Sequence, residues 1–456
     1  MRAVLAIDFG STYTKVAAVD VEGGEILGVA QRGTTALTDI GDGLDGALKL
    51  LREQIGDIEY VERYACSSAA GGLRMIASGL VPSLTAEAAK RAALGAGAKV
   101  VRTFSYELTR EDISEIARLK PDILLLTGGT DGGNRDNILL NAHALASLPA
   151  SFPVVVAGNR AVRDECARIL READCEAIPC ENVMPTFNQL NIEPAQAVIR
   201  ELFLKRIIAA KGLTKAQALI DGILMPTPAA VLAALELFAK DAGELVAVDL
   251  GGATTDIYSI TAGLPTKAGT VMKGLPEPYA KRTVEGDIGM RFSARGVVEG
   301  AGMEALVQSS GRTEAEVEAW LQEIERTPGV LAQTEAQKEI DLALASLAIE
   351  LGLVRHAGEI EQVYTPLGVA YQQTGKDLTR VKTIVLTGGA LVHAEDPRGI
   401  ARRALGGDHP SSLMPRDAVP VVDGRYILFA MGLLSQRYPD LARTLLKKEF
   451  QHGNSQ

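Results

Sequence analysis

Two carboxylates in this chain each follow an apolar run and precede a glycine-rich turn. The first, Asp8, ends the run VLAI and comes just before Gly10, Ser11 and Thr12. Glycine allows a backbone to approach a ligand closely, and successive turn amides can bind an anion. Lys15 adds a cation within reach of a terminal phosphate. A carboxylate beside such a turn suits hydrated Mg²⁺, which binds few carboxylates and keeps several waters, although a plain hairpin can have the same turn.

The second carboxylate, Asp249, repeats this plan. Residues 246–260, VAVDLGGATTDIYSI, form an apolar run that is followed by a turn and an alternating strand. The turn residues are Gly251, Gly252, Ala253, Thr254 and Thr255. A third apolar run, TIVLTGGALV at residues 383–392, leads into Gly388, Gly389 and Ala390. One hairpin would be weak evidence, but the repeated pattern with a third glycine turn predicts nucleotide binding.

These motifs, in this order, resemble those of the actin-like ATPase superfamily, which includes the Hsp70 chaperones, sugar kinases and actin. IDFGSTYTK resembles the first phosphate motif, VDLGGATTDI the second, and VLTGGA the adenosine motif. Residues 223–235 and 426–435, ILMPTPAAVLAAL and YILFAMGLLS, are similar to the two connecting helices. The resemblance implies that both hairpins hold the phosphates of ATP or ADP and that the third glycine turn packs against the adenosine.

The same resemblance implies a role for each candidate residue. Asp8 and Asp249 are expected to be the catalytic carboxylates and to bind Mg²⁺ through water, and Asp249 could also orient the attacking water. The expected nucleotide-binding set is Gly10, Ser11, Thr12, Lys15, Gly251, Gly252, Ala253, Thr254, Thr255, Gly388, Gly389 and Ala390. Asp256 and Asp287 could contribute to the site, or they could equally well serve strand pairing or domain closure. The expected reaction is hydrolysis of ATP to ADP and phosphate.

Alternating strand and helix patterns extend the prediction to the whole chain. We expect an α/β protein with a duplicated ribonuclease-H-like core of the actin/Hsp70 type, an inserted Rossmann-like α/β domain and a small helical subdomain. The expected segments are residues 1–83 (first half of the core), 84–211 (insertion), 212–298 (first connecting helix and second half of the core), 299–380 (helical subdomain), 381–446 (adenosine motif and second connecting helix) and 447–456 (a frayed tail).

One loop of the insertion, LTGGTDGGNRDN at residues 126–137, follows a strand and precedes a helix. Ligands on open parallel sheets bind at such strand ends. Two interpretations therefore stay open: a contact for an anion or a partner, or a loop that only caps the helix. Asp131 and Asp136 would repel a phosphate, which argues against a second nucleotide here.

Composition restricts the classes of partner. The chain has 456 residues and a net charge of −10 without a concentrated basic cluster, which argues against nucleic acid. Asp8 comes too early for a secretory signal, and no apolar run reaches the roughly 18 residues of a membrane span, so we expect a cytoplasmic protein. The cysteines and the five histidines lack metal-ligand spacing, so we interpret them as structural. The cysteines are Cys66, Cys166, Cys175 and Cys180.

Within the superfamily, the whole chain resembles the accessory proteins of coenzyme B12-dependent glutamate (methylaspartate) mutase. The similar stretches are AIDFGSTYTK, DILLLTGGTDGGNRDNIL, PVVVAGN, ILMPTPAAVL, VDLGGATTDI and VLTGGALVH. The resemblance implies a chaperone-like reactivating factor that uses Mg-ATP to exchange damaged cobalamin for intact cofactor in the mutase subunits. The sequence supplies no cobalamin ligand of its own, and it is compatible with a homo-oligomer.

Other functions would use the same motifs. A small-molecule kinase could bind its substrate on the insertion, and a nucleotide-switched scaffold or filament former would need no catalysis. The iron–sulfur activators of dehydratases also resemble the core. They require cysteines that bridge a dimer, an arrangement that these four cysteines do not show.

Overall fold

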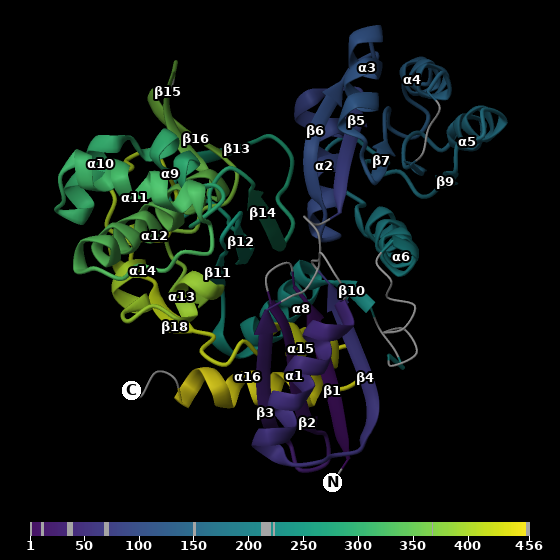
Figure 1. Ribbon diagram of the computed structural model, residues 1–456. Helices are drawn as coiled ribbons and strands as arrows, with labels where there is room; N and C mark the ends of the chain where they lie inside the picture. The colour runs from purple at the N-terminus through teal and green to yellow at the C-terminus, as the bar shows by residue number, and fades with distance from the viewer. Residues whose placement is uncertain are drawn as a thin grey trace. The chain divides into compact units, whose positions relative to one another are not determined.

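The structure is a computed structural model that describes residues 2–10, 13–33, 40–67, 73–148, 152–210, 220–221, 224–366 and 368–452. The chain divides into two compact units, and Figure 1 labels the helices and strands of both. The first unit comprises Met1–Ala233, Gly274–Pro276 and Phe429–Ala442. The second comprises Ala234–Lys273, Glu277–Leu428 and Arg443–Gln456. Among the described residues, no helix is both long and apolar enough to cross a membrane.

The first unit contains a five-stranded sheet with the strand order β10-β4-β1-β2-β3. Its strands are β1 (Ala3–Phe9), β2 (Tyr13–Asp20), β3 (Glu25–Gly33), β4 (Tyr60–Ser67) and β10 (Leu224–Pro226). The first three strands are antiparallel, whereas β4 pairs in parallel with β1, and β10 with β4. Every residue of β1 is buried, as expected for a strand covered on both faces. Helix α1 (Ile40–Ile55) packs against β2 and β3.

The second unit repeats this topology, with the strand order β14-β12-β11-β17-β18. Its strands are β11 (Leu245–Leu250), β12 (Thr255–Ile260), β14 (Ala280–Glu285), β17 (Thr383–Thr387) and β18 (Val419–Val422). Again three antiparallel strands are followed by two parallel ones. The fifth strands precede the two predicted connecting helices, α8 (Thr227–Ala242) and α15 (Leu428–Leu434). The duplicated core of the actin-like type is therefore confirmed.

The insertion in the first unit contains a parallel sheet with the order β6-β5-β7-β8-β9. Its strands are β5 (Arg74–Gly79), β6 (Lys99–Ser105), β7 (Ile123–Leu126), β8 (Val154–Val156) and β9 (Ala177–Pro179). Its helices are η1 (Pro82–Ala86), α2 (Glu87–Gly95), α3 (Arg110–Leu119), α4 (Asp136–Ala146), α5 (Arg163–Glu172) and α6 (Glu193–Ala210). This strand order is a doubly wound, Rossmann-like arrangement. Because β5 pairs with β6 and β7, the sheet begins before the boundary predicted at residue 84.

The remaining part of the second unit is mostly helical. Its helices are α9 (Ala294–Ala301), α10 (Met303–Ser310), α11 (Glu314–Arg326), α12 (Glu335–His356), α13 (Gly389–Val392) and α14 (Pro397–Leu405). Capping boxes begin α11 at Thr313 and α12 at Thr334. The predicted helical subdomain also contributes two strands to a small sheet of β13 (Thr270–Lys273), β16 (Gly368–Thr374) and β15 (Glu359–Thr365).

The expected frayed tail requires a correction. Helix α16 (Pro439–His452) continues past residue 447, where fraying was expected to begin. Phe450 is 2% exposed, and its ring centroid lies 4.7 Å from that of Phe238 on α8. The apolar contact explains why this polar-looking segment is helical.

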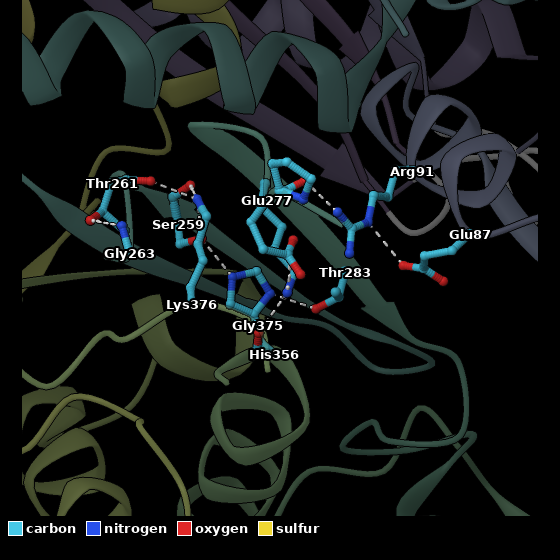
Figure 2. A network of polar contacts seen from close by, with 12 residues as sticks. Glu87, Arg91, Ser259, Thr261, Gly263, Glu277, Thr283, His356, Gly375 and Lys376 are labelled. Atoms are coloured by element: carbon cyan, nitrogen blue, oxygen red, sulfur yellow. Dashed lines mark hydrogen bonds and ion pairs between the residues drawn. The ribbon is translucent and has the colours of Figure 1, made fainter. Parts of the chain in front are cut away.

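A buried polar network joins strands of the second unit to α12 (Figure 2). The fully buried Lys376 donates from Nζ to the carbonyls of Thr261 and Tyr279, both at 2.8 Å. His356, also fully buried, makes 2.8 Å hydrogen bonds with the hydroxyls of Ser259 and Thr283. Burial lowers the pKa of His356 well below its usual value, with nearby lysines adding to the effect. This histidine is therefore neutral and structural, as interpreted from the sequence.

Candidate functional site

The first candidate site is the hairpin of β1 and β2. The amide of Gly10 donates to the carbonyl of Tyr13 at 3.1 Å, next to the point where the two strands meet. A Cβ atom at Gly10 would overlap the Tyr13 carbonyl oxygen, so this position requires glycine. Ser11 and Thr12, both predicted to contact the nucleotide, lie outside the described residues.

Asp8 lies at the end of β1 beside this turn, and its side chain is only 1% exposed. Its Oδ1 atom accepts hydrogen bonds from the Thr227 hydroxyl at 2.6 Å and from the Cys66 thiol at 3.5 Å. Lys15 Nζ lies 3.6 Å from the other carboxylate oxygen, Oδ2. The structure therefore brings together Asp8 and Lys15, both predicted from the sequence, and adds two donors that were not. Burial, followed by the Asp8 charge, raises the pKa of Cys66 well above its usual value, so the thiol keeps its proton.

The second candidate site is the turn between β11 and β12. The amide of Gly251 donates to the carbonyl of Thr254 at 3.0 Å, so Gly252 and Ala253 form a two-residue loop. Residues 290–293 donate hydrogen bonds to the carbonyls of Gly251, Gly252 and Ala253. The amides of Gly252 and Ala253 have no hydrogen-bond partner in the described part of the chain. Since the carbonyls are paired and the amides are not, this turn offers donors for an anion.

The segment after β14 holds the second turn in place. Gly289 packs directly on the turn, because a Cβ atom there would lie 2.6 Å from the Ala253 carbonyl carbon. Asp287 forms an ion pair with Arg355 at 2.9 Å, and Asp256 accepts a 2.8 Å hydrogen bond from Arg282. These ion pairs support the structural alternative for both aspartates.

Asp249 lies next to the predicted adenosine turn because β11 and β17 are parallel neighbours. In this register Asp249 is opposite Thr387. Gly388 follows with φ +92°, and a Cβ atom there would lie 2.6 Å from Asp249 Oδ1 and 2.5 Å from the Leu250 carbonyl oxygen. The second unit therefore brings Asp249, the hairpin turn and Gly388 to one edge of one sheet.

The other predicted residues of this region differ in accessibility. Gly389 is exposed, Ala390 is half-buried, and both lie in the short helix α13. Thr255 is buried on β12, where its hydroxyl donates to the Ile288 carbonyl at 3.1 Å. Sequence reasoning gave no role to Tyr426, which adopts φ +54°. Its hydroxyl lies beside Gly389, at 3.5 Å from where a Cβ atom of that residue would be.

The donors of each hairpin fit a magnesium ion that keeps most of its water. Each hairpin has one carboxylate at the end of its first strand, Asp8 or Asp249. No group of three or more His, Cys, Asp or Glu side chains within the described ranges could hold a metal directly. A hard cation that binds few carboxylates and retains several waters matches this chemistry.

Two contacts of Asp8 were missed from the sequence. Thr227 was assigned only to a connecting helix, and Cys66 was taken as an ordinary buried thiol. Thr227 could have been found from its position directly after a strand. Because β10, β4 and β1 are parallel neighbours, their carboxyl ends lie at the same edge of the sheet and bring Thr227 and Cys66 close to Asp8. Cys166 and Cys175 are buried, and Cys180 is half-buried with its pKa raised to about 11 by desolvation.

The glycine-rich loop of the insertion is held by internal hydrogen bonds. Buried Asn159 accepts from the Gly132 amide at 3.3 Å and donates to the Gly133 carbonyl at 3.1 Å. At the neighbouring strand end, the Thr85 hydroxyl accepts from the amides of Leu80 and Val81 at 2.8 and 3.0 Å. Backbone amides that could otherwise bind a phosphate thus donate to side chains of the protein itself. This supports the interpretation that the loop is structural and does not bind an anion.

Comparisons with known proteins agree with the sequence resemblance. A family model described as MutL protein matches residues 4–450. Protein MutL from Clostridium tetanomorphum is 46% identical over 457 residues, which cover 98% of this chain and 99% of that protein.

Solved structures show weaker similarity. A gluconate kinase from Lactobacillus acidophilus is 12% identical, with a TM-score of 0.34 and coverage of 100% of this chain and 97% of that one. The activator of 2-hydroxyisocaproyl-CoA dehydratase from Clostridium difficile, with bound ADPNP, is 10% identical, with a TM-score of 0.32 and coverage of 100% and 98%. Similarity at this level carries no argument about activity.

Proposed function

Because this chain belongs to the MutL protein family, we propose that it is an accessory ATPase that serves a coenzyme B12-dependent glutamate mutase. The observation that carries the proposal is the repeated carboxylate-bearing hairpin, which occupies the same place in two sheets of identical topology. In the second hairpin, two amides lack a partner within the described chain. Such donors suit the phosphates of a nucleotide.

The chemistry we propose depends on positioning and charge neutralisation. Asp8 and Asp249 would hold Mg²⁺ through its water ligands, and bound magnesium would neutralise charge on the phosphates. The amides of Gly252 and Ala253 donate to phosphate oxygens, and the Lys15 ammonium adds positive charge. Asp249 accepts a hydrogen bond from the attacking water and orients it, so no covalent intermediate with the protein is needed.

Hydrolysis would then drive the accessory role. Contacts with the γ-phosphate stabilise one conformation of the protein, and their loss shifts the population towards another. We propose that this shift loads intact cobalamin into the mutase subunits or releases damaged cobalamin from them. The support for the partner is membership of the family and the close relative.

The test is a steady-state ATPase assay of the purified protein with and without glutamate mutase subunits. The proposal predicts magnesium-dependent phosphate release that the mutase stimulates. Asp57→Asn, at an 85% exposed carboxylate paired with Arg52, is a matched control that should keep full activity, whereas Asp8→Asn should lose it.

Other outcomes identify the rival functions. Transfer of phosphate to a metabolite without mutase stimulation would indicate a kinase. ATP-dependent light scattering without turnover would indicate a filament-forming scaffold. Capture of a cobalamin-dependent mutase in only one nucleotide state would support the accessory role directly.

A further inference from the structure

Thr227, the first residue of α8, makes a close contact with the carboxylate of Asp8. Its hydroxyl lies 2.6 Å from Asp8 Oδ1, and both residues belong to the first unit. We infer that Thr227 is a positioning residue, which orients the Asp8 carboxylate for the cation and thereby sets the affinity with which Asp8 holds the metal ion. The inference rests on the proposed function, because it concerns the same carboxylate.

The two oxygens of the Asp8 carboxylate have different partners. Oδ1 receives the Thr227 hydroxyl and, at 3.5 Å, the thiol of Cys66. Oδ2 lies on the side of Lys15, whose ammonium is 3.6 Å away. A carboxylate that is 1% exposed needs hydrogen-bond donors, and a thiol is a weak one. The Thr227 hydroxyl is therefore the stronger of the two donors that fix the rotation of this side chain.

The helix that carries Thr227 is itself held firmly near its start. In the first unit, α8 crosses α15 at Ala230 and Gly432, where a Cβ atom at Gly432 would overlap the Ala230 carbonyl oxygen. Two backbones in direct contact leave little freedom for the first turn of α8. The hydroxyl is thus presented from a rigid support, which positioning of a metal-binding group requires.

The corresponding edge of the second sheet uses a threonine differently. Thr387 ends β17, the strand next to Asp249, and its hydroxyl donates to Asp423 Oδ2 at 3.2 Å. Asp423 Oδ1 in turn accepts from the Ile427 amide at 2.8 Å, just before α15. This threonine supports the start of a helix, whereas Thr227 acts on the hairpin carboxylate, so the inference applies to Asp8 alone.

The test measures Mn²⁺ binding to the full chain in the presence of ADP, with free Mn²⁺ followed by electron paramagnetic resonance. Thr227→Val keeps the shape and removes the hydroxyl. It should weaken Mn²⁺ binding by about 10- to 100-fold, the usual effect of removing a group that orients a metal ligand. Thr227→Ser restores the hydroxyl and should restore wild-type affinity. The concentration of Mg²⁺ that gives half-maximal ATP hydrolysis should rise in parallel for Thr227→Val.

Thr127→Val is the matched control, because that buried hydroxyl donates to the Ser78 carbonyl at 2.8 Å inside the insertion. It should leave Mn²⁺ affinity unchanged. The inference is overturned if Thr227→Val binds Mn²⁺ as tightly as wild type, or if Thr227→Ser is as weak as Thr227→Val. It is also overturned if both Thr227 variants fail to fold by circular dichroism while Thr127→Val folds.

The two proposals fail in different ways. If wild-type protein neither binds Mn²⁺ with ADP nor hydrolyses ATP, the proposed function falls and the inference with it. If wild type does both, Asp8→Asn loses both, and Thr227→Val matches wild type, only the positioning role of Thr227 falls.

Discussion

Replacing Gly388 by alanine tests whether the adenosine turn must lie against Asp249. A Cβ atom at Gly388 would lie 2.6 Å from Asp249 Oδ1, 2.6 Å from the Leu250 amide nitrogen and 2.5 Å from the Leu250 carbonyl oxygen. Two of these atoms belong to the backbone of a buried strand, which cannot move aside cheaply. Overpacking of this kind costs about 1–3 kcal/mol. The backbone of Gly388, with φ 92° and ψ 150°, lies in a region essentially restricted to glycine, which adds about 1–3 kcal/mol for any residue with a side chain.

The neighbouring glycine provides the control. At Gly389 the nearest atom to a new Cβ is the Tyr426 hydroxyl at 3.5 Å, an ordinary contact, and the position lies in α13. Gly389→Ala should therefore be neutral or stabilise the protein by up to about 1 kcal/mol, because alanine favours a helix.

Differential scanning calorimetry with and without ADP measures both effects. Gly388→Ala should lower the melting temperature of the second unit by at least about 4 °C, because it removes at least about 2 kcal/mol of unfolding free energy. It should also reduce the further stabilisation that saturating ADP provides, because the turn beside Asp249 has to shift. The reasoning is wrong if Gly388→Ala and Gly389→Ala unfold at the same temperature.

Three further predictions concern other parts of the chain. Asp8→Ala and Asp249→Ala should each abolish Mg-ATP turnover while the circular dichroism spectrum stays unchanged, and normal hydrolysis by either variant would refute its role. Phe450→Ala should destabilise the protein by about 3–5 kcal/mol in urea unfolding, because it empties a buried aromatic contact; no loss would mean that the tail is dispensable. Burial lowers the pKa of His356 in the folded protein, so on acidification the imidazole is protonated first in the unfolded chain. The free energy of unfolding should therefore fall as the pH drops below about 6.5, by up to about 1.4 kcal/mol per pH unit. His356→Gln should flatten this dependence, and an unchanged slope would contradict the assignment.

Sequence patterns predicted the elements of the core because its strands are strongly apolar and its turns are rich in glycine. The repeated hairpins, the third glycine turn and both predicted connecting helices lie where the motifs indicated. The positions of Asp8 and Asp249 follow from one local rule, a carboxylate at the end of a buried strand. Their proposed roles with metal and nucleotide stay predictions.

The contacts that the sequence did not reveal depend on strand register. Thr227 reaches Asp8 across 219 positions of sequence because β10 and β4 are parallel neighbours within the sheet that contains β1. A single sequence does not specify which strands become neighbours. The start of the insertion and the end of the last helix were misplaced for a similar reason, since the pairing of β5 and the packing of Phe450 are tertiary effects.

The stoichiometry of nucleotide binding tests the central claim most directly. Isothermal titration of wild-type protein with ADP and Mg²⁺ should give one nucleotide per chain, and Asp8→Asn and Asp249→Asn should each weaken that single event. Two nucleotides per chain, with each variant losing only one of them, would contradict the account.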